Sequence, residues 1–208
     1  MIITAHGGAL GTGRNTQAYF DSIDKYGADA IEVDIYKKGN LLYLSHLPAI
    51  FTKKKLTLRY AFELVKQNGL LINCDLKMKG IIQDVIALAK EVGVEDQLIF
   101  TGSVKIDTDY KYVDCGQGWF NSVGIKYTTQ NVKAIKEKID SFNNPHFAGI
   151  NLNYNTMDEA FIEECKKYDL KLSVWRIDKD EVLQRFGKLI DGNITTNEPV
   201  KVRAFLEK

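Results

Sequence analysis

Two carboxylates and a histidine lie close together in residues 30–46, which read AIEVDIYKKGNLLYLSH. Glu32 and Asp34 are two residues apart in an apolar run, so a strand over residues 31–35 places both side chains on one face. Two carboxylates held side by side repel each other unless a cation lies between them or one keeps its proton. The stretch therefore indicates a cation site, and the simpler alternative is a hairpin with a solvated acidic face.

Two of the three histidines of the chain fall at the ends of expected strands. The turn Gly39-Asn40 predicts that residues 41–45 return as a second strand, which brings His46 to its end. His6 follows a short apolar strand over residues 2–5. A histidine at a strand end is often a structural cap, but two on one face are suited to act as proton donor and acceptor beside a bound ion.

A third carboxylate, Asp75, ends the apolar run LLINCD at residues 70–75. Three carboxylates offer the hard oxygen ligands that Mg²⁺ or Ca²⁺ takes, and open positions on such an ion suit a phosphate. Lys77 follows on the same side, close enough to neutralise a phosphate. The residue types together indicate phosphate chemistry assisted by a divalent cation.

Short apolar runs alternate with amphipathic segments along the chain, which is typical of an α/β fold. Up to eight strand and helix pairs can be counted, the number that closes a TIM (βα)8 barrel, whose active face lies at the carboxyl ends of the strands. An open doubly wound sheet is the alternative, but its GxGxxG fingerprint is absent from the first turn, HGGALGTG. The expected strands are 2–5, 30–36, 70–75, 97–101, 112–115, 148–153, 170–176 and 193–196, and the expected helices are 16–26, 58–67, 81–92, 129–141, 157–168, 179–189 and 200–206.

The composition fits a single domain over residues 1–208. With a formal net charge of +1 and scattered Lys and Arg, we expect no nucleic-acid partner. No apolar run approaches membrane-spanning length, so we expect no stable membrane insertion, and we see no signal peptide. Cys74, Cys115 and Cys165 are odd in number and fit no CxxC spacing, which favours reduced, buried thiols in a cytoplasmic protein. The oligomeric state stays open.

Several motifs occur in a fixed order: AHGG at 5–8, RNT at 14–16, GADAIEVDI at 27–35 and LSH at 44–46, then INCDLK at 72–77, GINLNY at 149–154, LSVWRID at 172–178 and DGNITTNEP at 191–199. In this order they resemble the glycerophosphodiester phosphodiesterases, which are metal-dependent TIM barrels. The resemblance spans nearly the whole chain, and its first half is the more specific part.

The resemblance implies a small-molecule phosphodiester substrate that is split into an alcohol and a glycerol phosphate. It implies attack on phosphorus by a metal-activated oxygen, from water or from a neighbouring hydroxyl of the substrate. The implied roles are Glu32, Asp34 and Asp75 as ligands of one divalent cation (Mg²⁺ or Ca²⁺, with Mn²⁺ as a third option), His6 and His46 as general acid and base, Lys77 as a phosphate contact and Trp175 as the pocket wall against the glycerol part.

Four positions depart from the family pattern. Gly7 replaces the arginine that usually follows the first histidine, which removes a bidentate phosphate contact. Arg14 replaces a glutamate, Asp75 replaces a longer glutamate, and Leu47 replaces an aspartate after the second histidine. We hypothesise that Arg14 turns inward and supplies the missing guanidinium.

Two other functions remain open from the sequence. One is a barrel that has lost the reaction and only binds a phosphorylated ligand, which Gly7 and Asp75 would allow. The other is phospholipase or lyase chemistry on a phospholipid head group. Outside the site, we expect Trp119, Phe120 and Tyr127 to be packing residues and His146 to lie at the opposite, amino-terminal end of the barrel.

Overall fold

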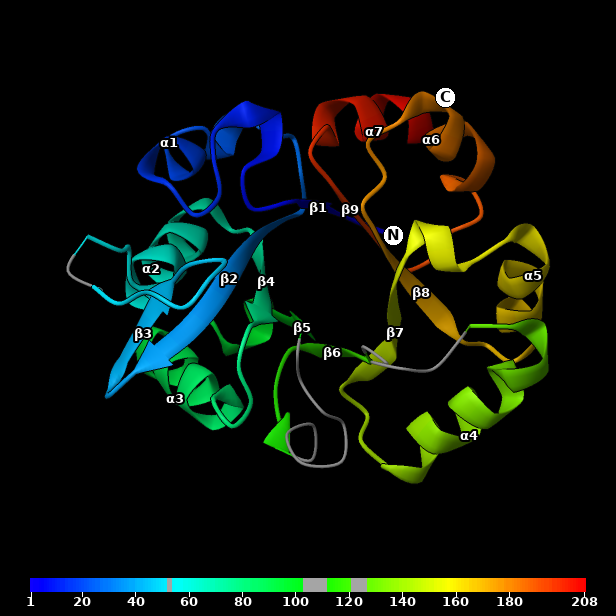
Figure 1. The fold of residues 1–208 in the computed structure, drawn as a ribbon, viewed down its shortest axis with the longest axis horizontal. Helices are drawn as coiled ribbons and strands as arrows, with labels where there is room; N and C mark the ends of the chain where they lie inside the picture. Colours follow the sequence, from blue (N-terminus) through cyan, green and yellow to red (C-terminus); the bar gives the residue numbers. More distant parts are fainter. Residues whose placement is uncertain (52–53, 103–111, 121–126) are drawn as a thin grey trace.

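The computed structural model describes residues 1–51, 54–102, 112–120 and 127–208. Within them, eight parallel strands form a ring with the helices outside it (Figure 1). The ring closes because β1 pairs with both the second and the last strand of the series. The predicted TIM barrel is therefore confirmed. The strands are β1 (Ile2–Ala5), β2 (Ala30–Lys38), β4 (Leu71–Leu76), β5 (Leu98–Gly102), β6 (Gln117–Phe120), β7 (Phe147–Asn153), β8 (Lys171–Trp175) and β9 (Asn193–Thr196).

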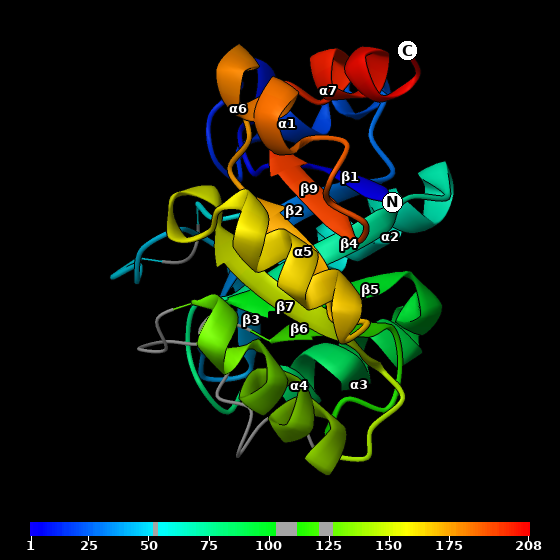
Figure 2. The same ribbon diagram turned by 90° about the vertical axis from the view of Figure 1, so that its right-hand side faces the viewer.

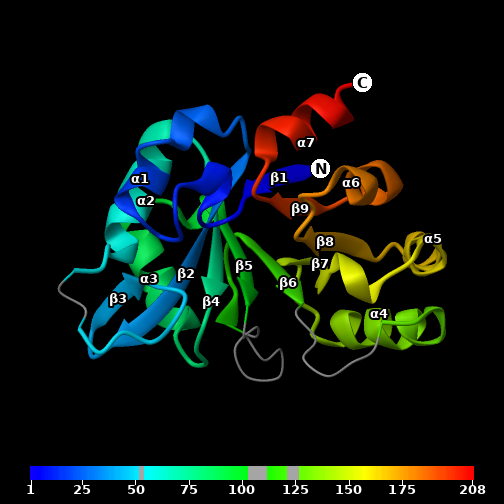
Figure 3. The ribbon, with the colours of Figure 1, turned by 45° about the horizontal axis from the view of Figure 1, so that its top comes forward.

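A ninth strand, β3 (Leu41–Leu44), pairs antiparallel with the far end of β2. Figure 3 shows this hairpin extending beside the barrel wall. The backbone N–H of Ser45 donates to the carbonyl of Asp34 at 2.9 Å, so the returning chain stays against β2 after the strand has ended. The predicted hairpin thus brings residue 46 back to the level of the carboxylates.

Amphipathic helices cover the outer face of the barrel, and Figure 2 shows α4 and α5 packed side by side there. Helix α2 begins after Thr57, whose hydroxyl accepts from the backbone N–H of Tyr60, and it ends before Gly69, which has the left-handed conformation. The helices are α1 (Gln17–Phe20), α2 (Leu58–Asn68), α3 (Ile82–Val92), α4 (Val132–Ser141), α5 (Glu159–Lys167), α6 (Asp180–Phe186) and α7 (Pro199–Leu206).

Two sequence predictions are wrong in their bounds. The strand expected at 112–115 is irregular, and the strand is β6 instead, because the side chains of Trp119 and Phe120 fill the barrel wall while Asp114 lies at the surface. The helix expected at 16–26 stops at Phe20 and gives way to a 3-10 turn at Ile23–Lys25. Residues 103–111 and 121–126, on either side of residues 112–120, lie outside the described residues.

The barrel interior changes from apolar to polar along the strands. At the amino-terminal end, Trp119 packs with Ala30 and Ile99 to close the barrel floor. Further toward the carboxyl ends, the inward positions of seven of the strands carry buried polar side chains, because inward residues alternate with outward ones. This middle layer contains Thr4, Glu32, Asn73, Thr101, Asn151, Ser173, Asn193 and Thr195.

Hydrogen bonds satisfy this buried polar layer. Thr4 donates to Asn193, Asn193 donates to Ser173, and Ser173 donates to Asn151, at 2.7 to 2.9 Å. The inward side chains closer to the carboxyl ends of the strands therefore pack on a layer that hydrogen bonds hold in place.

The cysteines, His146 and Tyr127 lie where the sequence predicts. Cys74, Cys115 and Cys165 are free and buried. His146 precedes β7 at the amino-terminal end of the barrel, where its Nδ1 lies 3.1 Å from the carbonyl oxygen of Gly116. Tyr127 packs edge-on against Phe161. None of the helices in the described segments is long and apolar enough to span a bilayer.

Candidate active site

A cavity of about 610 Å³ opens at the carboxyl ends of the strands. It draws its lining from both halves of the chain, and every residue that the sequence analysis predicted for the site lies on its wall. These residues are His6, Arg14, Glu32, Asp34, His46, Asp75, Lys77 and Trp175.

Three carboxylates converge in this cavity. Asp34 and Asp75 are directly paired across β2 and β4, and Glu32 lies one inward position below Asp34. One ligand oxygen from each of the three lies within 4.8 Å of the others. The β-sheet register thus places acids that are far apart in sequence around one point.

The surroundings of Asp75 fit a cation ligand. Its Oδ1 is buried and makes no hydrogen bond to any described group. A β-carbon at Gly102 would lie 2.1 Å from this oxygen, so the glycine leaves the space that the carboxylate needs. An unpaired buried carboxylate oxygen is costly unless a cation or a proton reaches it, so the three-carboxylate set fits a divalent metal ion.

The three carboxylates have different proton affinities. Burial, followed by the charges of Asp75 and Asp34, raises the pKa of Glu32 well above its usual value. Burial also raises the pKa of Asp75. Burial opposes ionisation of Asp34, but the charge of Lys77 and the hydrogen bonds from Lys77 and Asn15 together outweigh it, so the pKa of Asp34 is lowered. The ionised cluster is therefore stable only with positive charge close to it.

Lys77 supplies part of this positive charge. Its Nζ lies 2.8 Å from Oδ1 of Asp34 and also contacts Asp75. Burial lowers the pKa of Lys77, but the charges of the two carboxylates raise it overall. The lysine is thus held as a cation at the edge of the cluster, and its predicted contact with phosphate stays a prediction.

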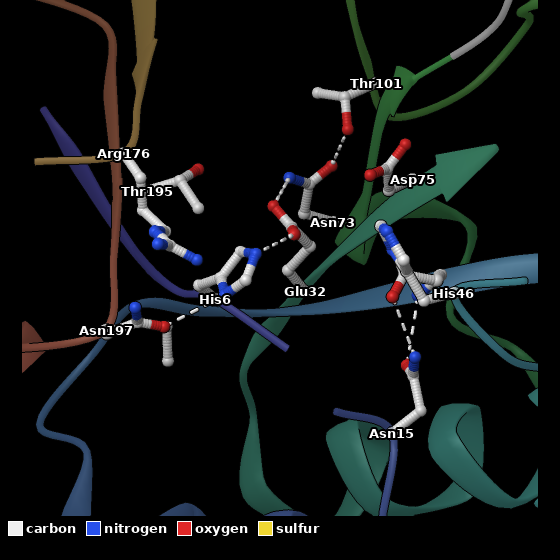
Figure 4. Close-up of polar contacts among 12 residues, drawn as sticks. His6, Asn15, Glu32, His46, Asn73, Asp75, Thr101, Arg176, Thr195 and Asn197 are labelled. Carbon is white, nitrogen blue, oxygen red and sulfur yellow. Dashed lines mark hydrogen bonds and ion pairs between the residues drawn. The ribbon is translucent and has the colours of Figure 1, made fainter. Parts of the chain in front are cut away.

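His6 is oriented by a chain of hydrogen bonds. Nδ2 of Asn197 donates to Oδ2 of Asp178 at 2.9 Å, which turns the amide oxygen of Asn197 toward the histidine. This oxygen lies 2.9 Å from Nδ1 of His6, so the ring donates its Nδ1–H. The other ring nitrogen, Nε2, lies 3.6 Å from Oε1 of Glu32 (Figure 4).

The charge state of His6 follows from its surroundings. Burial, together with the guanidinium charges of Arg176 and Arg14, lowers the pKa of His6 to about 4. The imidazole is therefore neutral near pH 7. With its proton on Nδ1, it presents the lone pair of Nε2 toward the carboxylates, which is the form a general base needs.

His46 lies on the other side of the carboxylates and is more open to solvent. Its Nδ1 lies 3.4 Å from Oδ1 of Asp34, and its side chain is 47% exposed. The two histidines thus differ in setting, one buried and neutral and the other at the rim beside an acid.

Three supporting residues were missed by the sequence analysis. Nδ2 of Asn15 donates to Oδ2 of Asp34 at 2.8 Å, and its Oδ1 accepts from the backbone N–H of Asp34 at 3.1 Å. Nδ2 of Asn73 donates to Oε2 of Glu32 at 3.1 Å, and Thr101 donates to Asn73 at 2.8 Å. Asn73 could have been found from its inward position two residues before Asp75, whereas Asn15 comes from a loop without such a signal.

Another part of the cavity wall is formed by the carboxyl end of β8 and by the loop that follows β1. Trp175 is 40% exposed and faces both this cavity and a neighbouring groove. Arg14 is an exposed residue at the rim. Arg176 follows Trp175 and pairs with Asp178, with its Nε 2.9 Å from Oδ2.

The class that these features define is a parallel eight-stranded barrel with an acidic cluster flanked by histidines at its carboxyl-terminal mouth. No family model and no curated protein matches the sequence. Comparison of the fold with solved structures, in contrast, gives many similar chains.

The similar structures carry related names. A protein from Agrobacterium tumefaciens, provisionally described as a glycerophosphoryl diester phosphodiesterase, has a TM-score of 0.83 at 15% identity, over 100% of this chain and 98% of its own. A glycerophosphodiester phosphodiesterase from Parabacteroides distasonis has a TM-score of 0.80 at 14% identity, over 99% and 96%.

A phosphodiesterase from Oleispira antarctica, solved with its product sn-glycerol-3-phosphate, has a TM-score of 0.75 at 16% identity, over 100% of this chain and 97% of its own. This chain therefore has the fold of the glycerophosphodiester phosphodiesterases, as its motifs predict.

Proposed function

We propose that this protein is a metal-dependent phosphodiesterase that hydrolyses glycerophosphodiester-like substrates to an alcohol and a glycerol phosphate. The observation that carries the proposal is the convergence of three carboxylates and two differently placed histidines in one cavity. The names of the similar structures support it, and so does the glycerol phosphate bound to the Oleispira antarctica enzyme.

Glu32, Asp34 and Asp75 would hold the divalent cation, for which Mg²⁺, Ca²⁺ and Mn²⁺ are the candidates. When bound, such an ion supplies Lewis-acid stabilisation of the charge that develops on phosphate oxygens. Asn15 and Asn73 fix the orientation of Asp34 and Glu32 through the hydrogen bonds described above, which keeps the ligands in place.

His6 accepts a proton at Nε2 from the attacking hydroxyl or water in this proposal. Its neutral state and the hydrogen bond from its Nδ1 to Asn197 keep that nitrogen available. His46, beside Asp34 at the rim, protonates the oxygen of the leaving alcohol. The buried histidine thus acts as base and the exposed one as acid, which is the assignment their surroundings favour.

Three further residues would bind the substrate. Lys77 lies against Asp34 and Asp75 and would offset the negative charge of the phosphate. Trp175 offers an exposed aromatic face for the glycerol part. Arg14 at the rim would add a guanidinium after an inward turn of its side chain.

Hydrolysis of glycerophosphocholine and of bis-p-nitrophenyl phosphate with added Mg²⁺, Ca²⁺ or Mn²⁺ tests the proposal. We expect turnover that a chelator abolishes and that His46→Ala lowers by at least a hundredfold. Saturable binding of glycerol phosphate without turnover on any diester would instead indicate a ligand-binding barrel. A cyclic phosphate product from micellar lysophospholipid would indicate the lyase alternative.

A further inference from the structure

We propose that Arg176 is a further anion-binding residue of the cavity, and that its guanidinium holds the phosphate of the substrate on the β8 side, next to His6. This inference rests on the proposed function. Figure 4 shows the guanidinium directed past Thr195 toward His6, on the side of the site away from Asp75 and His46. The Arg176 side chain lies on the wall of the cavity and is 38% exposed.

One end of the guanidinium is anchored. Its Nε lies 2.9 Å from Oδ2 of Asp178. That carboxylate is itself fixed, because it accepts from the backbone N–H of Asn197 at 2.8 Å, from the Asn197 amide at 2.9 Å and from the Thr196 hydroxyl at 3.2 Å. Arg176 is therefore positioned before any ligand arrives.

The other end of the guanidinium is available. The contact to Asp178 is made by Nε, and within the described part of the chain no hydrogen bond engages Nη1 or Nη2 of Arg176. Two parallel N–H groups in a rigid plane match two oxygens of a phosphate. The position beside the neutral imidazole of His6 would place that phosphate next to the proposed base.

Arg176 and Arg14 differ in the side-chain freedom that each would lose on binding an anion. Both lie close enough to His6 to lower its pKa, Arg176 more strongly. Arg14 is exposed and has no anchoring contact among the described residues, so it must lose side-chain freedom on binding. Arg176 has already lost that freedom, which is the arrangement that increases affinity. Gly7, directly after His6, contributes no side chain at all.

Calorimetric titration of the Mg²⁺-loaded protein with glycerol phosphate tests this inference without depending on turnover. We expect Arg176→Ala to weaken binding 10- to 100-fold. Arg176→Lys keeps the charge but loses the paired N–H groups, so we expect it to recover only part of the affinity. Arg14→Ala should weaken binding less than Arg176→Ala does, because Arg14 is not anchored by any residue that the structure describes and must lose side-chain freedom on binding. Arg185→Ala, which removes an arginine paired with Glu159 on the surface, serves as the matched control.

Binding of glycerol phosphate by Arg176→Ala with the affinity of the unchanged protein would overturn the inference. So would a failure of the unchanged protein to bind either glycerol phosphate or inorganic phosphate. If the unchanged protein binds glycerol phosphate but hydrolyses no diester, the proposed function fails, whereas the binding comparison still decides the role of Arg176. Melting temperatures of all variants show whether a loss of binding comes from unfolding.

Discussion

Oδ1 of Asn197 lies 2.9 Å from Nδ1 of His6, although the two residues are 191 positions apart in the chain. The carboxylate of Asp178 fixes the amide of Asn197, and this amide decides which ring nitrogen of His6 carries the proton. The hydrogen-bond chain leaves Nε2 with its lone pair toward the carboxylates. A residue that does not line the cavity can therefore control the proposed base.

We predict that Asn197→Ala lowers kcat 10- to 100-fold with a smaller change in KM, because the imidazole loses its fixed tautomer. Nitrogen NMR of the histidine rings checks this directly, since the unchanged protein should show His6 protonated at Nδ1 and the variant a mixture of tautomers. Asn68→Ala, a surface amide on α2, is the control. An unaltered ring spectrum in Asn197→Ala would contradict the prediction.

The three histidines provide an internal comparison. We predict that His6→Ala and His46→Ala each lower kcat by 10²- to 10⁴-fold, the usual range for loss of a general acid or base. His146 lies at the opposite end of the barrel, so His146→Ala should keep kcat within about twofold. Steady-state kinetics on glycerophosphocholine measures all three. Equal losses in the three variants would mean that the effect comes from folding.

The raised pKa values of Glu32 and Asp75 predict how stability depends on pH. Groups whose pKa is raised on folding contribute stability that is fully present below their unfolded pKa values, about 4, and is lost as pH rises through the raised values. Asp34 has the opposite sign, because its pKa is lowered. His6 also has the opposite sign, because burial lowers its pKa from 6.5 to about 4, so its contribution to stability rises with pH over that range. We therefore expect the melting temperature of the metal-free protein to fall between pH 7 and pH 9, where His6 stays neutral.

A bound cation should remove this fall, because it supplies the charge that the ionised cluster needs. At a cation concentration of a hundred times Kd, the stabilisation is about 2.7 kcal/mol, or roughly 5 to 10 °C for a chain of this size. Calorimetry with and without Mg²⁺ at both pH values measures it. Glu32→Gln should reduce the dependence of the melting temperature on pH in the metal-free protein. A melting temperature that falls with pH as steeply as in the unchanged protein would count against this explanation.

Gly102 is predicted to be irreplaceable. Its φ is +96°, and an added β-carbon would lie 2.1 Å from Oδ1 of Asp75 and 2.6 Å from backbone atoms of Leu76. We expect Gly102→Ala to cost about 3 kcal/mol or more and to weaken cation binding. Gly69→Ala is the matched control, because Gly69 also has a positive φ but nothing within 4 Å. The control should cost only about 1 to 2 kcal/mol.

Denaturant unfolding and Mg²⁺ titration separate these two glycine variants. If Gly102→Ala and Gly69→Ala lose the same stability and both keep cation affinity, the close approach of Asp75 to Gly102 is unimportant.

The sequence by itself determined the barrel and predicted the residues that converge in the candidate site. Alternating apolar and polar residues along β2 place Glu32 and Asp34 on one face, and Asp75 ends an apolar run, so parallel strands bring the three carboxylates to one edge of the barrel. The histidines follow from the same rule, because His6 ends a strand and His46 ends the return of a hairpin. These inferences need only local periodicity, which the sequence carries in full.

Tertiary structure alone decided the bounds of β6 and the network around the site. The strand near residue 115 was misplaced because buried residues in an irregular segment, such as Val113, give the same local pattern as a strand. The contacts of Asn15 with Asp34 and of Asn197 with His6 join residues 19 and 191 positions apart. Such pairings depend on how loops close over the barrel mouth, and no periodicity within a segment records that.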